Sequence, residues 1–131
     1  MAYASQASSY REMEILSAPP ERLVVLLFDH LVVQLHRVKL AIERNDITLR
    51  TVSLAKARGI VSELLATLDF DKGGRIAVDL SSLYSFMLGE FIDVGVRRDP
   101  HHVARLIGIA EELREGFTGA ANQQLQLKRP A

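Results

Sequence analysis

The sequence predicts an all-α protein, an antiparallel up-down-up-down four-helix bundle with a mobile N-terminal arm. Three observations lead to this prediction. Apolar residues recur at three- and four-residue spacing in each of four long segments, and none of the segments shows the period-two alternation of a half-buried strand. Proline, glycine, asparagine and aspartate separate the segments. The connections are only a few residues long, so successive helices should be antiparallel neighbours.

The first helix is expected to begin near Pro20 and to run to about Arg44. Proline suits the first turn of a helix because its missing N–H would have no partner there, and the carboxylate of Glu21 lies favourably against the positive helix end. Asn45 and Asp46 end this helix, because their side-chain oxygens compete for backbone groups. Asp46 can then cap the helix that follows.

Three further helices are expected at residues 47–70, 75–98 and 100–117. Gly73 and Gly74 should close the turn after the first of these, since glycine takes positive φ angles readily. Asp99 offers an N-cap acceptor, and Pro100 occupies the first position of the last helix. The predicted divisions of the chain are an N-terminal arm, the four-helix bundle and a flexible C-terminal tail, at residues 1–16, 17–118 and 119–131.

The composition excludes several classes of partner. The chain has 131 residues, of which 48% are apolar, and its 16 basic and 16 acidic side chains balance, so no nucleic-acid surface is expected. It contains no cysteine, which removes disulfides and thiol nucleophiles and fits a reducing compartment. Residues 1–10 lack the features of a signal peptide, and the apolar run Leu23–Phe28 is too short to insert into a membrane. We therefore expect a cytoplasmic protein.

The first helix carries more apolar side chains than one face can hold. Its core stripe includes Leu31 and Leu35, but further apolar residues fall well away from that stripe on a helical wheel, at Val25, Leu26, Val32, Val33 and Leu40. Phe86 likewise projects among charged residues of the third helix. Contiguous exposed apolar surface usually marks an interaction site, and an amphipathic helix laid into a groove is its natural ligand.

A structural explanation competes with this hypothesis. Supercoiling rotates the stripe over several turns, a central helix buries more than one face, and the N-terminal arm can cover the surplus. Tyr10 and Ile15 in the arm have the required apolar character, so the arm can also occupy a groove until a partner displaces it. The residues predicted to contact a partner are Tyr10, Ile15, Val25, Val32, Val33 and Phe86.

The sequence offers no constellation of catalytic or metal-binding residues. A di-iron bundle needs Glu-x-x-His pairs, and no glutamate in this chain has a histidine three residues later. His101 and His102 are adjacent, so on a helix they point about 100 degrees apart and suit one metal poorly. We therefore expect no metal, no cofactor and no enzymatic activity. The rival function is histidine phosphotransfer, in which His30 or His36 would carry the phosphate.

The order and spacing of several motifs resemble the flagellar secretion chaperone family, FliS, over about Tyr10 to Phe117. The motifs are Pro20-Glu21, Phe28-Asp29, Lys56-Ala57, Leu68-Asp69 with Lys72-Gly73-Gly74, and Leu83-Tyr84 with Phe86-Met87. The chain departs from the family pattern at Pro19, Phe28, His30 and Phe117, where the family usually has a Ser or Thr cap, tyrosine, glycine and tryptophan.

The resemblance implies a cytosolic protein that binds the disordered C-terminal segment of flagellin and prevents its premature polymerisation. It also implies that the client wraps the bundle, that the N-terminal arm moves aside, and that the complex is presented to the export gate of the flagellar type III secretion system. No nucleotide is needed for holding the client. A homodimer stays compatible with the sequence.

Overall fold

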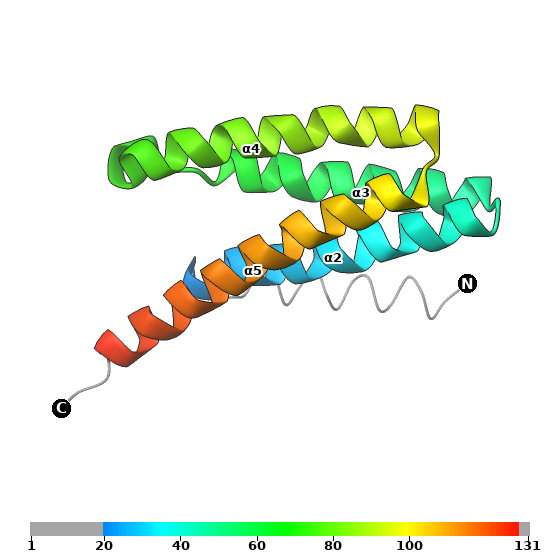
Figure 1. Cartoon of the computed structure of the whole chain (residues 1–131). Coiled ribbons are helices and arrows are strands. Elements are labelled where there is room, and N and C mark those ends of the chain that lie inside the picture. Colours follow the sequence, from blue (N-terminus) through cyan, green and yellow to red (C-terminus); the bar gives the residue numbers. More distant parts are fainter. Residues whose placement is uncertain (1–19, 129–131) are drawn as a thin grey trace.

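The computed structural model describes the backbone of residues 20–128 and the side chains of residues 22–120. This part of the chain forms four helices, α2 (Pro20–Glu43), α3 (Ile47–Ala66), α4 (Phe70–Arg97) and α5 (Pro100–Lys128), each running opposite to the one before (Figure 1). The prediction of an all-α four-helix bundle is confirmed. The predicted N-terminal arm, with Tyr10 and Ile15, lies outside the described residues.

Local cap chemistry sets three of the helix boundaries. Asp46 is extended and its Oδ1 accepts a hydrogen bond from the backbone N–H of Leu49 at 3.0 Å, so α3 begins where the sequence predicted. Asn45 has a φ of 55°, which turns the chain between α2 and α3. Asp99 Oδ1 accepts from the N–H of His101 at 2.9 Å at the start of α5. Each cap satisfies a backbone donor that has no partner within its helix.

The predicted end of α3 and the predicted start of α4 are both wrong. Helix α3 ends at Ala66 rather than near Phe70, because Asp69 Oδ1 accepts from the N–H groups of Asp71 and Lys72 at 3.0 Å and starts α4 early. The glycine turn then lies inside α4 as a kink, where Gly74 has a φ of 49° and a ψ of −123°. A single capped turn therefore precedes the main body of α4.

Helix α5 also extends beyond its predicted end at Phe117 and continues to Lys128, through most of the segment that we expected to be a tail. Gly119 costs a helix only about 1 kcal/mol relative to alanine. The residues that follow it are mostly alanine, glutamine, leucine and lysine, which favour a helix and offset that cost.

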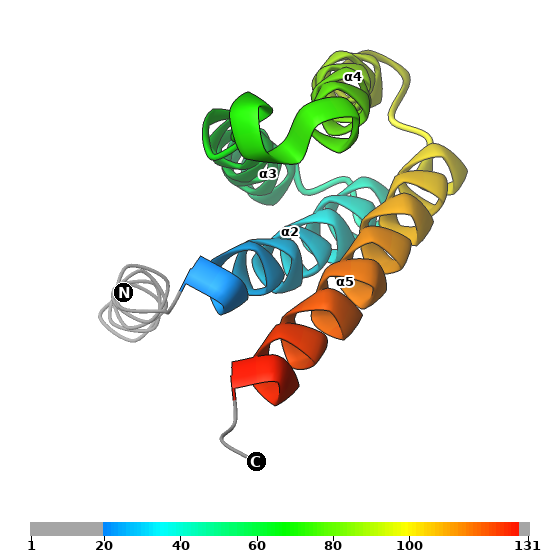
Figure 2. The same ribbon diagram turned by 90° about the vertical axis from the view of Figure 1, so that its left-hand side faces the viewer.

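Helix α2 lies at the centre of the packing. It packs against both α3 and α5, whereas α4 packs mainly on α3 and meets α5 at few positions (Figure 2). The core is built around α2 residues that are fully buried, including Phe28, Leu31, Leu35 and Val38 at 0% exposure. None of the described helices combines the length and apolar character needed to cross a membrane.

The central position of α2 explains why its apolar residues exceed one face. Asp29 lies 3.6 Å from Arg114 and His36 lies 3.9 Å from Glu111, so the face of α2 that holds Asp29 and His36 is turned toward α5. Val32 lies between these two residues on the same face and is 7% exposed as part of the core.

The exposure that we predicted for Val25 and Val32 is therefore wrong. Val25, one turn before Asp29, is 8% exposed. The prediction holds better on the outward side of α2, where Val33 is half-buried and Leu40 is 38% exposed. Phe86 on α4 is 50% exposed, so the exposure predicted for it is confirmed.

Candidate functional site

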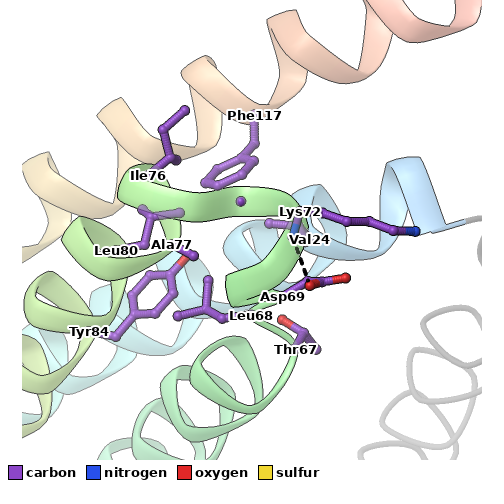
Figure 3. Close-up of a pocket in the computed structure, with 11 residues that line it drawn as sticks. Val24, Thr67, Leu68, Asp69, Lys72, Ile76, Ala77, Leu80, Tyr84 and Phe117 are labelled. Atoms are coloured by element: carbon purple, nitrogen blue, oxygen red, sulfur yellow. Dashed lines mark hydrogen bonds between the residues drawn. The ribbon is translucent and has the colours of Figure 1, made fainter.

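An apolar pocket opens where α4 and α5 diverge. The two helices separate from their short connection at residues 98–99, as Figures 1 and 2 both show. At the open end lies a pocket of about 300 Å³ that also reaches the start of α2 and the end of α3 (Figure 3). Its lining residues are Val24, Thr67, Leu68, Asp69, Lys72, Gly73, Ile76, Ala77, Leu80, Tyr84 and Phe117.

The spacing of the α4 residues explains the wall that this helix contributes. Ile76, Leu80 and Tyr84 follow one another at four-residue intervals and so line one face of α4. Val94 lies five helical turns beyond Ile76 on the same face and is 1% exposed, whereas Ile76 is 70% exposed. The same face of α4 is thus covered near the connection and uncovered at the pocket.

An aromatic cluster forms the inner side of the pocket. The ring of Phe28, which is fully buried, stacks on Phe117 with a centroid separation of 5.4 Å and lies tilted to Tyr84 at 6.3 Å. Tyr84 and Phe117 face the pocket from α4 and α5 (Figure 3). Because Phe28 sits on α2, the cluster joins three helices and gives the pocket a wall held by core packing.

The polar groups at the rim are largely engaged in local structure. The Asp69 carboxylate caps α4 through the two N–H groups described above, and the Thr67 hydroxyl donates to the carbonyl of Leu64 at 2.8 Å. Within the described residues, no group of three His, Asp or Glu side chains could hold a metal ion. The pocket is suited to holding apolar side chains.

Burial raises the pKa of Tyr84 from 10.0 to about 12, because the apolar surroundings disfavour the ionised phenolate. Below pH 10 the phenol is neutral in both the folded and the unfolded chain, and its contribution to stability is fully present. As the pH rises toward 12, the Tyr84 phenol ionises in the unfolded chain before it ionises in the folded chain. The free energy of unfolding therefore falls.

We expect the free energy of unfolding to fall by about 2 kcal/mol between pH 9 and about pH 11.5 through Tyr84 alone. Tyr84→Phe keeps the aromatic ring and removes the ionisable group, so the variant should lack this part of the fall. Urea unfolding of both proteins across that pH range measures the difference. Parallel pH profiles for the two proteins would contradict this assignment.

The structure separates the residues predicted to contact a partner. Phe86 lies exposed on α4 but does not line the pocket. Val32 lies in the core beneath α5, Val25 is buried two turns earlier on α2, and Val33 is on the outward side of α2. Sequence reasoning did not single out Ile76, Leu80 and Phe117 as site residues, because their three- and four-residue spacing is that of the buried stripe of a helix. A helical wheel shows on which face a residue lies and carries no signal that α5 leaves that face uncovered.

The two histidines considered for phosphotransfer do not lie in the pocket. His36 is exposed and its Nε2 lies 3.9 Å from a Glu111 carboxylate oxygen. His30 is half-buried, and its Nε2 is hydrogen-bonded to the side-chain amide of Gln34 at 3.0 Å. Neither arrangement adds support for that function.

Comparisons with known proteins agree on one family. The model of the family described as "Flagellar protein FliS" matches residues 1–124. The chain is 33% identical over 107 residues to the flagellar secretion chaperone FliS of Salmonella typhimurium, covering 81% of this chain and 79% of the relative. It is 27% identical over 111 residues to the flagellar secretion chaperone FliSB of Pseudomonas aeruginosa, covering 85% of this chain and 88% of the relative. It is 21% identical over 124 residues to FliS of Bacillus subtilis, covering 95% of this chain and 92% of the relative.

Proposed function

This chain belongs to the FliS family of flagellar secretion chaperones, and on that premise we propose that it binds the disordered C-terminal segment of flagellin. In this proposal it acts in the cytoplasm, prevents premature polymerisation of its client and delivers it to the flagellar type III export apparatus, through contact with a component of the export gate. The family is not one of enzymes, so histidine phosphotransfer is not retained.

The observation that carries the proposed client site is the uncovered apolar face between α4 and α5. An amphipathic helix presents apolar side chains every three or four residues, and a groove between two helices accepts such a row. Each large apolar side chain that moves from water into the pocket contributes about 1.5–3 kcal/mol. The exposed side chain of Ile76 and the aromatic wall at Phe117 offer the client this apolar surface.

The proposed mode of binding also accounts for release. A disordered segment loses conformational entropy when it folds onto the chaperone, and the apolar burial must offset this loss. The remaining net affinity is smaller than the buried area alone would give, which suits handover at the export gate.

The earlier contact residues stay predictions within this proposal. Phe86 and Val33 are accessible enough to touch a client directly, whereas Val25 and Val32 would support the neighbouring surface from beneath. Tyr10 and Ile15 belong to the segment outside the described residues, and their contact with the client groove is a prediction from the sequence.

We expect the full chain to bind a peptide of the last few dozen residues of flagellin from the same cell with a Kd in the micromolar range or tighter. Burial of apolar surface should give a negative heat-capacity change on binding. Isothermal titration at several temperatures measures both quantities. A peptide of the same composition in scrambled order is the control, and equal binding of the two peptides, or no binding of either, would refute the proposed function.

A further inference from the structure

A part-buried polar pair joins α4 and α5 close to their connection. His102 Nε2 lies 3.2 Å from Glu90 Oε2, and the two side chains are 8% and 25% exposed. A carboxylate only accepts hydrogen bonds, so the His102 Nε2–H donates to it. The backbones of α4 and α5 approach each other at few positions, and this pair is a polar contact that joins the two helices.

Among the residues that the structure describes, Glu90 is the hydrogen-bond partner of the His102 ring. Its other ring nitrogen, Nδ1, is buried and makes no hydrogen bond to any part of the chain that the structure describes. The bond to Glu90 therefore satisfies Nε2 and leaves Nδ1 unpaired within the described residues. Without that bond, both ring nitrogens would be buried and unpaired, which favours movement of the ring toward water.

The connection itself is short and well defined. Arg98 takes a left-handed conformation with a φ of 52°, and its N–H donates to the carbonyl of Val94 at 3.0 Å. Pro100 begins α5 two residues later. The connection fixes where the helices meet. The pair joins the first turn of α5 to a point two turns inside α4, and can thereby fix the angle between them.

The pocket lies on the same side of α4 and further from the connection. At 1.5 Å per residue, Glu90 is about 10 Å from the end of α4 at Arg97, and Ile76 is about 32 Å from it. If α4 pivots at its end, a shift of 1 Å at Glu90 moves Ile76 by about 3 Å. A small change at the pair would thus become a larger change in the width of the pocket.

We propose that Glu90 and His102 are a positioning pair that sets the spacing of α4 and α5, and so how far the client pocket opens. The part of this inference that concerns the client rests on the function proposed above. Neither residue lines the pocket, so their effect on binding is transmitted through the positions of the two helices.

The test measures helix spacing and client affinity on the same proteins. The chain has no cysteine, so Ser82→Cys on α4 and Glu112→Cys on α5, both at exposed positions, give two unique sites for spin labels. Glu90→Ala should shift or broaden the distance distribution between the labels by a few ångströms. Its affinity for the C-terminal flagellin peptide should change by about three- to thirtyfold.

Three further variants separate positioning from general stability. Glu90→Gln keeps an acceptor oxygen for His102 and should restore both the distance and the affinity. Glu90→Ala combined with His102→Ala removes both polar groups and so relieves the unpaired imidazole, yet its helix spacing should still change. Asp93→Ala removes an exposed carboxylate from the same helix and should change neither quantity.

An unchanged label distance in both Glu90→Ala and the double variant would overturn the inference. A changed distance with unchanged client affinity would overturn its link to the pocket. If the unmodified chain fails to bind the flagellin peptide, the proposed function fails, while the label distances still decide whether the pair positions the helices.

Discussion

Val32→Asp is expected to unfold the bundle, whereas Val33→Asp, one residue further along α2, is expected to leave it folded. Val32 is 7% exposed and belongs to the core beneath α5, while Val33 is half-buried on the outward side. A carboxylate at position 32 would lose its hydration in the apolar core, and the apolar burial of valine would also be lost. We expect Val32→Asp to lower the free energy of unfolding by more than about 4 kcal/mol.

Urea unfolding followed by circular dichroism measures both variants. Val33→Asp is the matched control, since it makes the same chemical change in the same turn of the same helix. We expect it to cost about 1 kcal/mol, mainly through lost partial burial. Equal stability of the two variants would show that α5 does not cover this face of α2 and that α2 is not the central helix.

Ile76→Asp is expected to weaken binding of the flagellin peptide by about thirtyfold or more and to leave the bundle folded. Ile76 lines the pocket and is 70% exposed, so the folded chain can solvate a carboxylate there. In the complex the carboxylate would be desolvated against apolar client side chains. We expect Ile76 to be a hot spot of the interface, and truncating a hot spot costs at least about 2 kcal/mol, which corresponds to this change in Kd.

Ile92→Asp provides the control on the same helix. Ile92 is 65% exposed and lies about 160 degrees around α4 from Ile76, away from the pocket. Its affinity for the peptide, measured by isothermal titration, should stay within about twofold of the unmodified chain. Equal losses for the two variants would mean that the client contacts both faces of α4, and no loss for Ile76→Asp would remove the pocket as the client site.

The helix boundaries show where local chemistry was sufficient. Pro20, Asp46 and Pro100 act on backbone groups within a turn of themselves, and the helices begin as these residues predicted. The end of α3 and the kink at Gly74 were misplaced, because Asp69 caps a short turn before the glycine and the sequence also allowed a simple connection there. Both outcomes satisfy the local rules, so the motif alone did not select between them.

The candidate site shows where a periodic pattern was not sufficient. The exposure of Phe86 followed from its place among charged residues, but Val25 and Val32 were assigned to the outside because the wheel assumed one buried face. Helix α2 has neighbours on two sides and buries both. Conversely, Ile76 has the spacing of a core residue and is exposed, because its expected neighbour α5 has diverged.

By itself the sequence determined the all-α class, the four helices with most of their starting points, and, through its motifs, the resemblance to one family. These depend on the backbone and on residues close together in the chain. The tertiary structure decided which faces of α2 are covered, that α4 and α5 diverge, and that Glu90 meets His102. Such features depend on the number of neighbouring helices and on the angles between them. Contacts between residues far apart in the sequence set both quantities, and the apolar period of a single helix encodes neither.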